Sequence, residues 1–430
     1  MIKVGLVSLG CAKNRIDSEM MLAMFDPAFY QLTDDPKEAN LIIVNTCGFI
    51  AAAKKESIDT ILEMCQYGAK VAVVGCLAER YYDELKASLT EASLIVPIRK
   101  YQDLPELLSS LTGQGGIAPL NPLKRIVSTP KYSAYLRISE GCNNFCAFCA
   151  IPYIRGRFVS RPYEEILAEA KELHAKGVKE ISLISQDTTR YGFDFKGQRP
   201  NIVDLLKAIE AIGFYSIRLL YLYPDEISDE LIDLIGQSKS IAHYFDIPVQ
   251  AGSDHLLKAM RRHGDKAQMM QLFKTIKAKV PDAILRTTLI AGFPGESAKD
   301  QAETLQFLKD VRFDHMGCFT YSREEGTAAY SFSHQIPEKT KQARYGELMK
   351  LQKQISYEKN KARIGQVMEG LVVGYDAPHD LYSLRSTWNA PDDIDGTISF
   401  ASGRPLALGE VVRVKITGAF VYDLFGERIA

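Results

Sequence analysis

Three cysteines within eight residues, Cys142, Cys146 and Cys149, constrain this chain more than any other feature of its sequence. Their C-x3-C-x2-C spacing is typical of a metal-binding loop, and zinc and iron–sulfur are the two candidates. A structural zinc site takes four ligands, often as two CxxC pairs, and the sequence has neither a second CxxC pair nor an HxxxH pair. A [4Fe–4S] cluster normally takes four thiolates. Three thiolates on one loop therefore favour a cluster with one open iron, where a small molecule can bind.

Three further cysteines each follow a predicted strand near the amino terminus. Cys11, Cys47 and Cys76 lie within two residues of short apolar runs, which are typical of parallel strands buried on both faces. The runs and the helical patterns between them cover residues 2–9, 18–24, 41–45, 51–64, 71–74 and 79–89. This alternation predicts a doubly wound α/β domain over residues 1–112, with ligands at the carboxyl ends of the strands. We therefore predict a second three-thiol iron–sulfur site there, whereas Cys65, at a helix end, is expected to be structural.

Residues 113–133 carry turn-forming glycines and prolines and are expected to be a linker. Residues 134–362 then alternate strand and helix six times, and a long helix is predicted over 338–363. The predicted strands are 134–139, 180–184, 216–221, 244–249, 283–291 and 315–320, and the predicted helices lie near 163–176, 202–212, 228–235, 253–262 and 297–309. Six βα units are too few for a closed eight-stranded barrel. The loop with three cysteines follows the first strand, at the end where such folds place their sites. Cys318 lies inside a strand and is expected to pack.

These motifs resemble a known family. The cysteine loop, with Phe148 before its last cysteine, is similar to the radical S-adenosylmethionine (SAM) superfamily. The strings Gly10-Cys11-Ala12-Lys13-Asn14, Asn45-Thr46-Cys47 and Gly75-Cys76 resemble the methylthiotransferases within that superfamily. Lys13-Asn14 and the string Gln186-Asp187-Thr188-Thr189 look like the branch that modifies an aspartate of ribosomal protein S12. The tRNA-modifying branch tends to have Gln-Met in place of Ala12-Lys13.

The resemblance implies the rest of the site. It implies a partial (β/α)6 barrel for the radical SAM domain and two [4Fe–4S] clusters, one on each set of three cysteines. SAM would bind beside the central cluster, and the candidate contacts are Phe148, Gln186, Gln250 and Gly292. In the implied reaction a radical made from SAM removes a hydrogen from the β-carbon of the substrate aspartate, and a methylthio group joins that carbon. No catalytic residue beyond the cluster ligands is implied. A flavodoxin or ferredoxin would supply the electron.

The last 65 residues change to short strands, predicted at 367–373, 381–385, 396–400, 411–417 and 420–424. Five such strands predict a small OB-like β-barrel over residues 366–430, which resembles the TRAM-like substrate-recognition domain of the family. This segment has nine acidic and five basic residues, a net charge of −4. Phosphate contacts need the opposite charge, so the barrel suits a basic partner such as a ribosomal protein of the small subunit better than tRNA. We expect Asp392, Asp393 and Asp395 to lie on its surface.

Two other functions stay open at this stage. A tRNA methylthiotransferase would have the same cofactors, and an electron carrier with two clusters would not need the SAM loops. The sequence begins without a signal-peptide pattern and contains no apolar run that could span a bilayer, so we expect no membrane association and a cytoplasmic location. The eight cysteines in 430 residues are too sparse for a disulfide framework.

Overall fold

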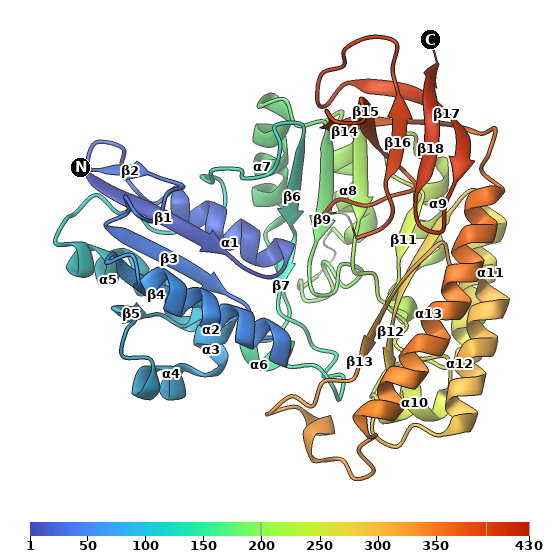
Figure 1. The fold of residues 1–430 in the computed structure, drawn as a ribbon, viewed down its shortest axis with the longest axis horizontal. Helices are drawn as coiled ribbons and strands as arrows, with labels where there is room; N and C mark the ends of the chain where they lie inside the picture. Colours follow the sequence, from blue (N-terminus) through green and yellow to red (C-terminus); the bar gives the residue numbers. More distant parts are fainter. Residues whose placement is uncertain (198–199, 393, 430) are drawn as a thin grey trace.

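The computed structural model describes residues 1–197, 200–392 and 394–429. Three units follow one another along the chain (Figure 1). The amino-terminal unit lies beside the central unit, and the carboxy-terminal barrel covers one end of the central strands.

The amino-terminal unit is a parallel sheet with helices on both faces, as predicted. Its strands are, in spatial order, β2 (Tyr30–Leu32), β1 (Ile2–Ser8), β3 (Leu41–Thr46), β4 (Lys70–Gly75) and β5 (Leu94–Ile95). Leu41 and Ile43 pack with α1 (Ala12–Leu22) and α5 (Leu104–Thr112), whereas Ile42 and Val44 pack with α2 (Ala51–Cys65), α3 (Cys76–Arg80) and α4 (Tyr82–Ser88). The 3-10 helix η1 (Ile98–Asp103) precedes α5. The two short edge strands were not predicted, and α1 begins six residues earlier than predicted, directly after Cys11.

The central unit is a partial barrel of six parallel strands. Its halves are β6 (Ser133–Arg137), β9 (Glu180–Ile184) and β10 (Ser216–Leu219), then β11 (Tyr244–Asp246), β12 (Ile284–Ala291) and β13 (His315–Thr320). The amide of Ile217 donates to the carbonyl of Ser240 over 2.7 Å and joins the halves.

Helices surround these strands in the order α7 (Tyr163–Ala175), α8 (Ile202–Glu210), α9 (Asp229–Gln237), α10 (Asp254–Ala259), α11 (Lys266–Lys279), α12 (Ala298–Val311) and α13 (Glu338–Lys361). Shorter elements are β7 (Ser139–Glu140), α6 (Ile151–Ile154), β8 (Val159–Ser160), η2 (Pro224–Glu226) and η3 (Ala328–Ser331). Helix α11 was missed, although Met269, Phe273 and Ile276 form its buried stripe and Asp265 caps it.

The carboxy-terminal unit is a closed five-stranded barrel, as predicted. Its order is β14 (Val367–Asp376), β15 (Leu381–Ser386), β16 (Ile398–Ala401), β18 (Leu424–Ile429) and β17 (Val411–Ala419). The predicted fifth strand at 420–424 is wrong. Because β17 and β18 pair antiparallel, the chain must reverse between them, and the Phe420 amide donates to the Asp423 carbonyl across that turn over 2.8 Å.

The loop between β15 and β16 enters the end of the central barrel. Asp395 is fully buried there and accepts hydrogen bonds from the Tyr244 hydroxyl over 2.7 Å and from Arg286 Nε over 3.3 Å. Asp392 accepts from the Tyr135 hydroxyl over 2.5 Å. The expectation of surface carboxylates is therefore wrong for Asp395. Asp392 is exposed, as expected, although it also accepts this hydrogen bond, and Asp393 lies outside the described residues. The cause is that the inner face of the central strands carries arginine and tyrosine at this end, which need buried acceptors.

In the same loop, the Trp388 carbonyl lies 2.7 Å from His315 Nε2, and Arg218 Nη2 donates to the Ser386 carbonyl over 2.8 Å. Arg385 of β15 pairs with Glu180 of β9 at 2.9 Å. The two barrels are thus tightly coupled. The carboxy-terminal barrel contributes one acidic and one basic residue to these ion pairs, Asp395 and Arg385, so the pairing does not change its net charge of −4.

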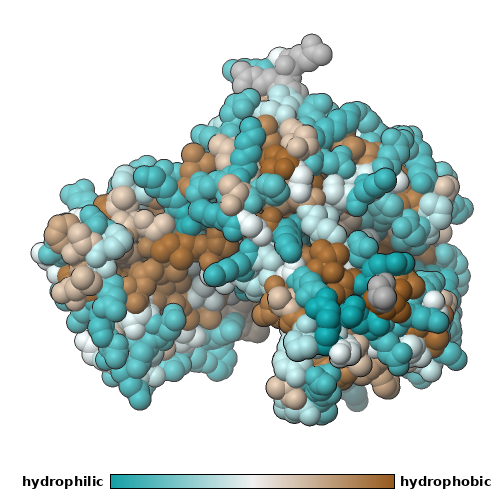
Figure 2. All heavy atoms as spheres, turned by 90° about the horizontal axis from the view of Figure 1, so that it is seen from above, coloured by the Kyte–Doolittle hydropathy of each residue, from teal (hydrophilic) through white to brown (hydrophobic). Residues whose placement is uncertain are grey.

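Seen from above, the molecule is mostly hydrophilic, and a hydrophobic area lies over the amino-terminal unit at the left (Figure 2). Within residues 1–197, 200–392 and 394–429, every helix is too short or too polar to cross a bilayer.

Candidate functional site

The central set of cysteines lies on the loop between β7 and α6, beyond the carboxyl end of β6. Cys142 and Cys146 are buried, and Cys149 is half-buried. The Cys142 amide donates to the Gly156 carbonyl over 3.2 Å, and the Cys149 amide donates to the Cys146 carbonyl over 2.9 Å. Gly141 is at φ +75, and a Cβ there would lie 2.2 Å from the carbonyl oxygen of Arg157. The loop is therefore tightly folded and requires glycine where it begins.

Side chains from distant elements approach the Cys146 sulfur. The Tyr223 hydroxyl lies 3.3 Å from it, and Arg262 Nη1 lies 3.7 Å from it. Arg262 also stacks on the Tyr223 ring, 3.9 Å from its centroid. Burial raises the pKa of the Cys142 thiol to about 11 and raises the pKa of Cys149 well above its usual range. These thiols favour the protonated form on their own, so binding of a metal must displace their protons.

The amino-terminal cysteines come from three separate strand ends. Cys11 is the N-cap of α1, Cys47 follows β3, and Cys76 begins α3 after β4. Gly10 is at φ +86, and a Cβ there would lie 2.9 Å from Cys47 Cβ, so the first two cysteines come together across a glycine. Burial, helped by the charges of Cys11 and Cys47 and opposed by Arg155, raises the pKa of Cys76 to about 12.

Asn14 ties these strand ends together. Its Nδ2 donates to the Leu9 carbonyl and to the Thr46 carbonyl, each over 2.9 Å, and its Oδ1 lies 3.5 Å from the Cys76 sulfur. The side chain therefore touches the ends of β1 and β3 and the cysteine after β4. This explains why an asparagine follows Cys11 by three residues.

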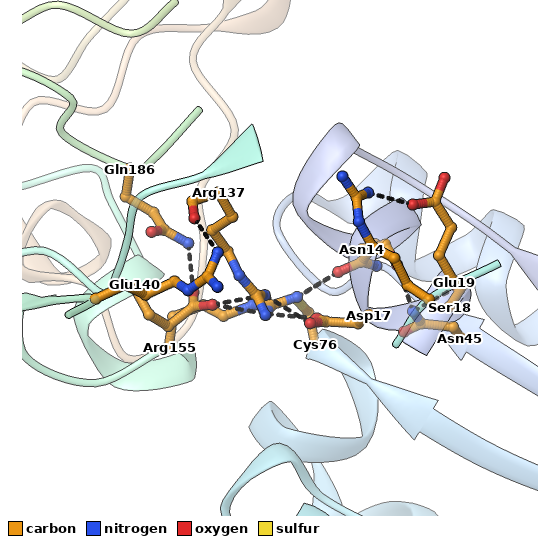
Figure 3. A network of polar contacts seen from close by, with 12 residues as sticks. Asn14, Asp17, Ser18, Glu19, Asn45, Cys76, Arg137, Glu140, Arg155 and Gln186 are labelled. Carbon is orange, nitrogen blue, oxygen red and sulfur yellow. Dashed lines mark hydrogen bonds and ion pairs between the residues drawn. The ribbon is translucent and has the colours of Figure 1, made fainter. Parts of the chain in front are cut away.

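A polar network connects the amino-terminal unit, near Cys76, with the central unit (Figure 3). Arg155, six residues beyond Cys149, donates to Asp17 of α1 over 2.7 Å and also to Asn14. Arg137 donates to Asp17 over 2.6 Å and to Glu140 over 2.9 Å. Burial alone would raise the pKa of Asp17, but Arg155 and Arg137 outweigh that effect and hold the pKa below its usual range. The network therefore joins Asp17 of the amino-terminal unit to two arginines of the central unit.

An apolar contact follows the same path. Cys76 packs with Ala150 and Ile154, and Ala150 is adjacent to Cys149 in the chain. The two sets of three cysteines thus lie on neighbouring edges of two units.

Both sets suit a cluster better than a single ion. Among the described residues, no three Cys, His, Asp or Glu side chains converge closely enough to hold one metal ion. A cubane instead takes one thiolate at each iron, which spreads its ligands over a larger volume. In both sets the cysteines are near enough to one another for their charges to affect each other's pKa, and no described carboxylate or imidazole joins them in a compact group of metal ligands. Thiolates are the usual ligands of iron–sulfur clusters, so the donor type of both sets fits such a cluster.

The four predicted SAM contacts do not form one cluster of interacting residues. Gln186 Nε2 donates to Glu140 over 2.7 Å, and its Oε1 is buried without a hydrogen-bond partner in the described part of the chain. Gln250 is at φ +72 and bonds through its backbone to β12. Phe148 packs against the barrel core. Gly292 is at φ +76, where a Cβ would lie 2.3 Å from Lys341 Cγ, so contact with α13 accounts for this glycine.

Sequence reasoning missed the residues that act through others. Arg155, Tyr223 and Arg262 reach the cysteines from separate loops, and no local pattern marks them. Asp187 belongs to a motif that the sequence singled out, and it accepts from Asn144 Nδ2 over 2.8 Å, beside Cys142.

Comparison with known families covers all three units. The Uncharacterized protein family UPF0004 matches residues 3–97, the Radical SAM superfamily matches 136–308, and the TRAM domain matches 364–429. A ribosomal protein uS12 methylthiotransferase RimO of Acetivibrio thermocellus is 43% identical over 99% of this chain and 98% of its own. The protein of the same name from Clostridium kluyveri is 45% identical, also over 99% of this chain and 98% of its own. The chain belongs to the RimO family of radical SAM methylthiotransferases.

The fold agrees with this membership. The structure of the radical SAM methyltransferase TsrM from Kitasatospora setae has a TM-score of 0.55 to this RimO-family chain, at 14% identity. The similarity covers 89% of this chain and 81% of that one. At such low identity the comparison shows the fold alone.

Proposed function

We propose that the chain adds a methylthio group to the β-carbon of an aspartate in ribosomal protein S12. The proposal rests chiefly on the placement of two three-thiol sets on facing edges of two units, with one buried network between them. Relatives named for uS12 methylthiotransferase activity, similar over nearly their whole length, support the choice of substrate.

Two [4Fe–4S] clusters and SAM are the cofactors in this proposal. Cys142, Cys146 and Cys149 would hold one cluster, and Cys11, Cys47 and Cys76 would hold the other. Gln186 is the best-supported SAM contact, because its buried Oε1 has no partner among the described residues and would otherwise cost free energy. When bound, a cluster with an open iron supplies the one-electron cleavage of SAM that produces a carbon radical. The protein must position the reactants and keep water out.

The chain's own side chains meet those two needs. Tyr223 and Arg262 fix the Cys146 sulfur, and Asn14 fixes the strand ends that carry the amino-terminal cysteines. The loop with Trp388 and Asp395 closes the opposite end of the central barrel. Solvent and substrate must therefore enter from the side of the cysteines.

Three further assignments belong to the proposal. A flavodoxin- or ferredoxin-type protein would supply the electron, and the reaction would take place in the cytoplasm, where thiols stay reduced. The carboxy-terminal barrel would help to dock the small ribosomal subunit with its remaining acidic face, since complementary charge favours association.

The test is an anaerobic reaction of the reconstituted enzyme with reductant, SAM and either S12 or tRNA. We expect S12 to gain one methylthio group in place of a hydrogen on an aspartate, together with release of 5′-deoxyadenosine. Tandem mass spectrometry locates the group. A methylthio-nucleoside in the tRNA arm, with unmodified S12, would contradict the proposal.

A further inference from the structure

Lys13 has an unusual position between the two units. It is the second residue of α1 and is only 6% exposed, yet its ammonium makes no hydrogen bond or ion pair within the described part of the chain. Its observed partner is the ring of Tyr221, whose centroid lies 3.2 Å from Lys13 Nζ. A buried ammonium without a hydrogen-bonding partner is costly, so a structure that retains one has a use for it.

The position of Tyr221 places this ammonium at the mouth of the central barrel. Tyr221 lies two residues beyond β10, at the end of the strands where barrel enzymes bind their substrates. Its backbone is at φ +63, a strained conformation for an aromatic residue, and it is held there because its amide donates to Asp246 over 2.9 Å. The strain thus presents the ring to a lysine from another unit.

The carboxylates near Lys13 are already neutralised by arginines. Burial lowers the pKa of Lys13, and Glu140 and Asp246 are close enough for their charges to act in the opposite direction. However, Glu140 pairs with Arg137 at 2.9 Å, and Asp246 pairs with Arg286 at 2.9 Å. Lys13 is therefore the cation in this group that still lacks a carboxylate partner. The amino-terminal end of α1 adds a partial positive charge at the same place.

We propose that Lys13 is a specificity-determining residue that binds the side-chain carboxylate of the substrate aspartate. This inference rests on the proposed function and names the residue that recognises the group next to the reacting β-carbon. Lys13 is two positions from Cys11, and its ammonium lies by the barrel mouth. A carboxylate held there keeps its β-carbon between the two sets of cysteines. A neutral tRNA nucleobase in the same position would leave the ammonium without a charged partner.

The test is a double-mutant cycle on the holoenzyme, with Lys13→Met on one side and S12 in which the target aspartate is asparagine on the other. A charge-assisted hydrogen bond predicts that Lys13→Met weakens binding of unchanged S12 about ten- to a hundredfold. The same variant should bind the asparagine form of S12 no more weakly than the parent enzyme does. Lys13→Arg should restore the preference for aspartate, and Lys37→Met, an exposed lysine of the same unit, should change nothing.

Binding is compared per iron-loaded molecule. Incomplete loading of a variant then lowers the binding signal but does not change the ratio of its dissociation constants for the two S12 forms. A role in packing alone would weaken binding of both S12 forms equally, and that result would overturn the assignment. If the parent enzyme modifies S12 and the cycle shows no coupling, only the Lys13 assignment fails. If the parent enzyme does not modify S12, the proposed function fails, and the assignment fails with it.

Discussion

The two sets of three cysteines differ in how the chain brings them together. Cys142, Cys146 and Cys149 share one loop, and their spacing is visible in eight consecutive residues. Cys11, Cys47 and Cys76 span 66 residues and meet only because β1, β3 and β4 are adjacent and parallel. The first set is thus a property of local sequence, and the second is a property of the tertiary fold. A substitution that destabilises the fold should therefore cause loss of iron from the amino-terminal set before the central set.

The surroundings differ in the same way. Cys146 is contacted by side chains of its own unit, Tyr223 and Arg262. The amino-terminal set depends on Asn14, which in turn accepts a hydrogen bond from Arg155 of the central unit. The second set therefore needs the docking of the two units, and the first does not.

The largest effect is expected from removal of Arg155. In Arg155→Met, Asp17 keeps Arg137 but loses one of its two buried partners, and a broken buried pair costs about 3–5 kcal/mol. We expect a lower free energy of unfolding and loss of iron from the amino-terminal set, with the central set still loaded. Urea unfolding and iron analysis check this. Arg157→Met, at an exposed site two residues away, is the control, and equal iron loss in both variants would contradict the account.

A glycine substitution separates backbone strain from crowding at the cysteines. Gly10→Ala places a Cβ 2.9 Å from Cys47 Cβ at φ +86, whereas Gly68→Ala meets no atom within 4 Å at φ +77. The left-handed backbone should cost each variant about 1–2 kcal/mol. Only Gly10→Ala should also lose amino-terminal iron. Normal iron content in Gly10→Ala would show that the contact between Cys11 and Cys47 is not needed.

The smallest effect is expected at Asp300, whose hydrogen-bond partners Ser253, His255 and Ser297 belong to neither set of cysteines. Burial would raise its pKa, but hydrogen bonds from Ser253 and Ser297 lower it to about 2. Since the folded pKa lies below the unfolded value of about 4, this carboxylate stabilises the protein above pH 4, and the contribution is lost as the pH falls toward 2.

Asp300→Asn should therefore cost about 1–2 kcal/mol at neutral pH and lose less stability than the parent between pH 4 and pH 2. Unfolding measured across that range tests this. Asp310→Asn on the same helix is the control. A change in the iron content of either set would contradict the separation of this site from the cysteines.

Much of the fold was predictable because its signals are local. The αβα layering follows from the apolar runs at β1, β3 and β4, and the start of α12 follows from the Ser297-Asp300 capping box. The six cysteines could be singled out for the same reason. Arg155, Tyr223 and the ammonium of Lys13 could not be placed, because their roles depend on contacts between residues far apart in sequence. The fifth barrel strand and the inward direction of Asp395 were misjudged, since strand pairing and domain docking, rather than composition, determine them.

The central claim is that the two sets are separate sites with different tasks, and single and triple cysteine variants test it most directly. Anaerobically reconstituted parent enzyme should hold about eight irons, as two four-iron clusters. Replacement of Cys142, Cys146 and Cys149 by alanine should remove about half of them and abolish SAM cleavage. Cys47→Ala should still release 5′-deoxyadenosine and add no methylthio group to S12. If both triple variants hold almost no iron, or if Cys47→Ala with an intact central cluster fails to cleave SAM, the two sets act as one site and the account is wrong.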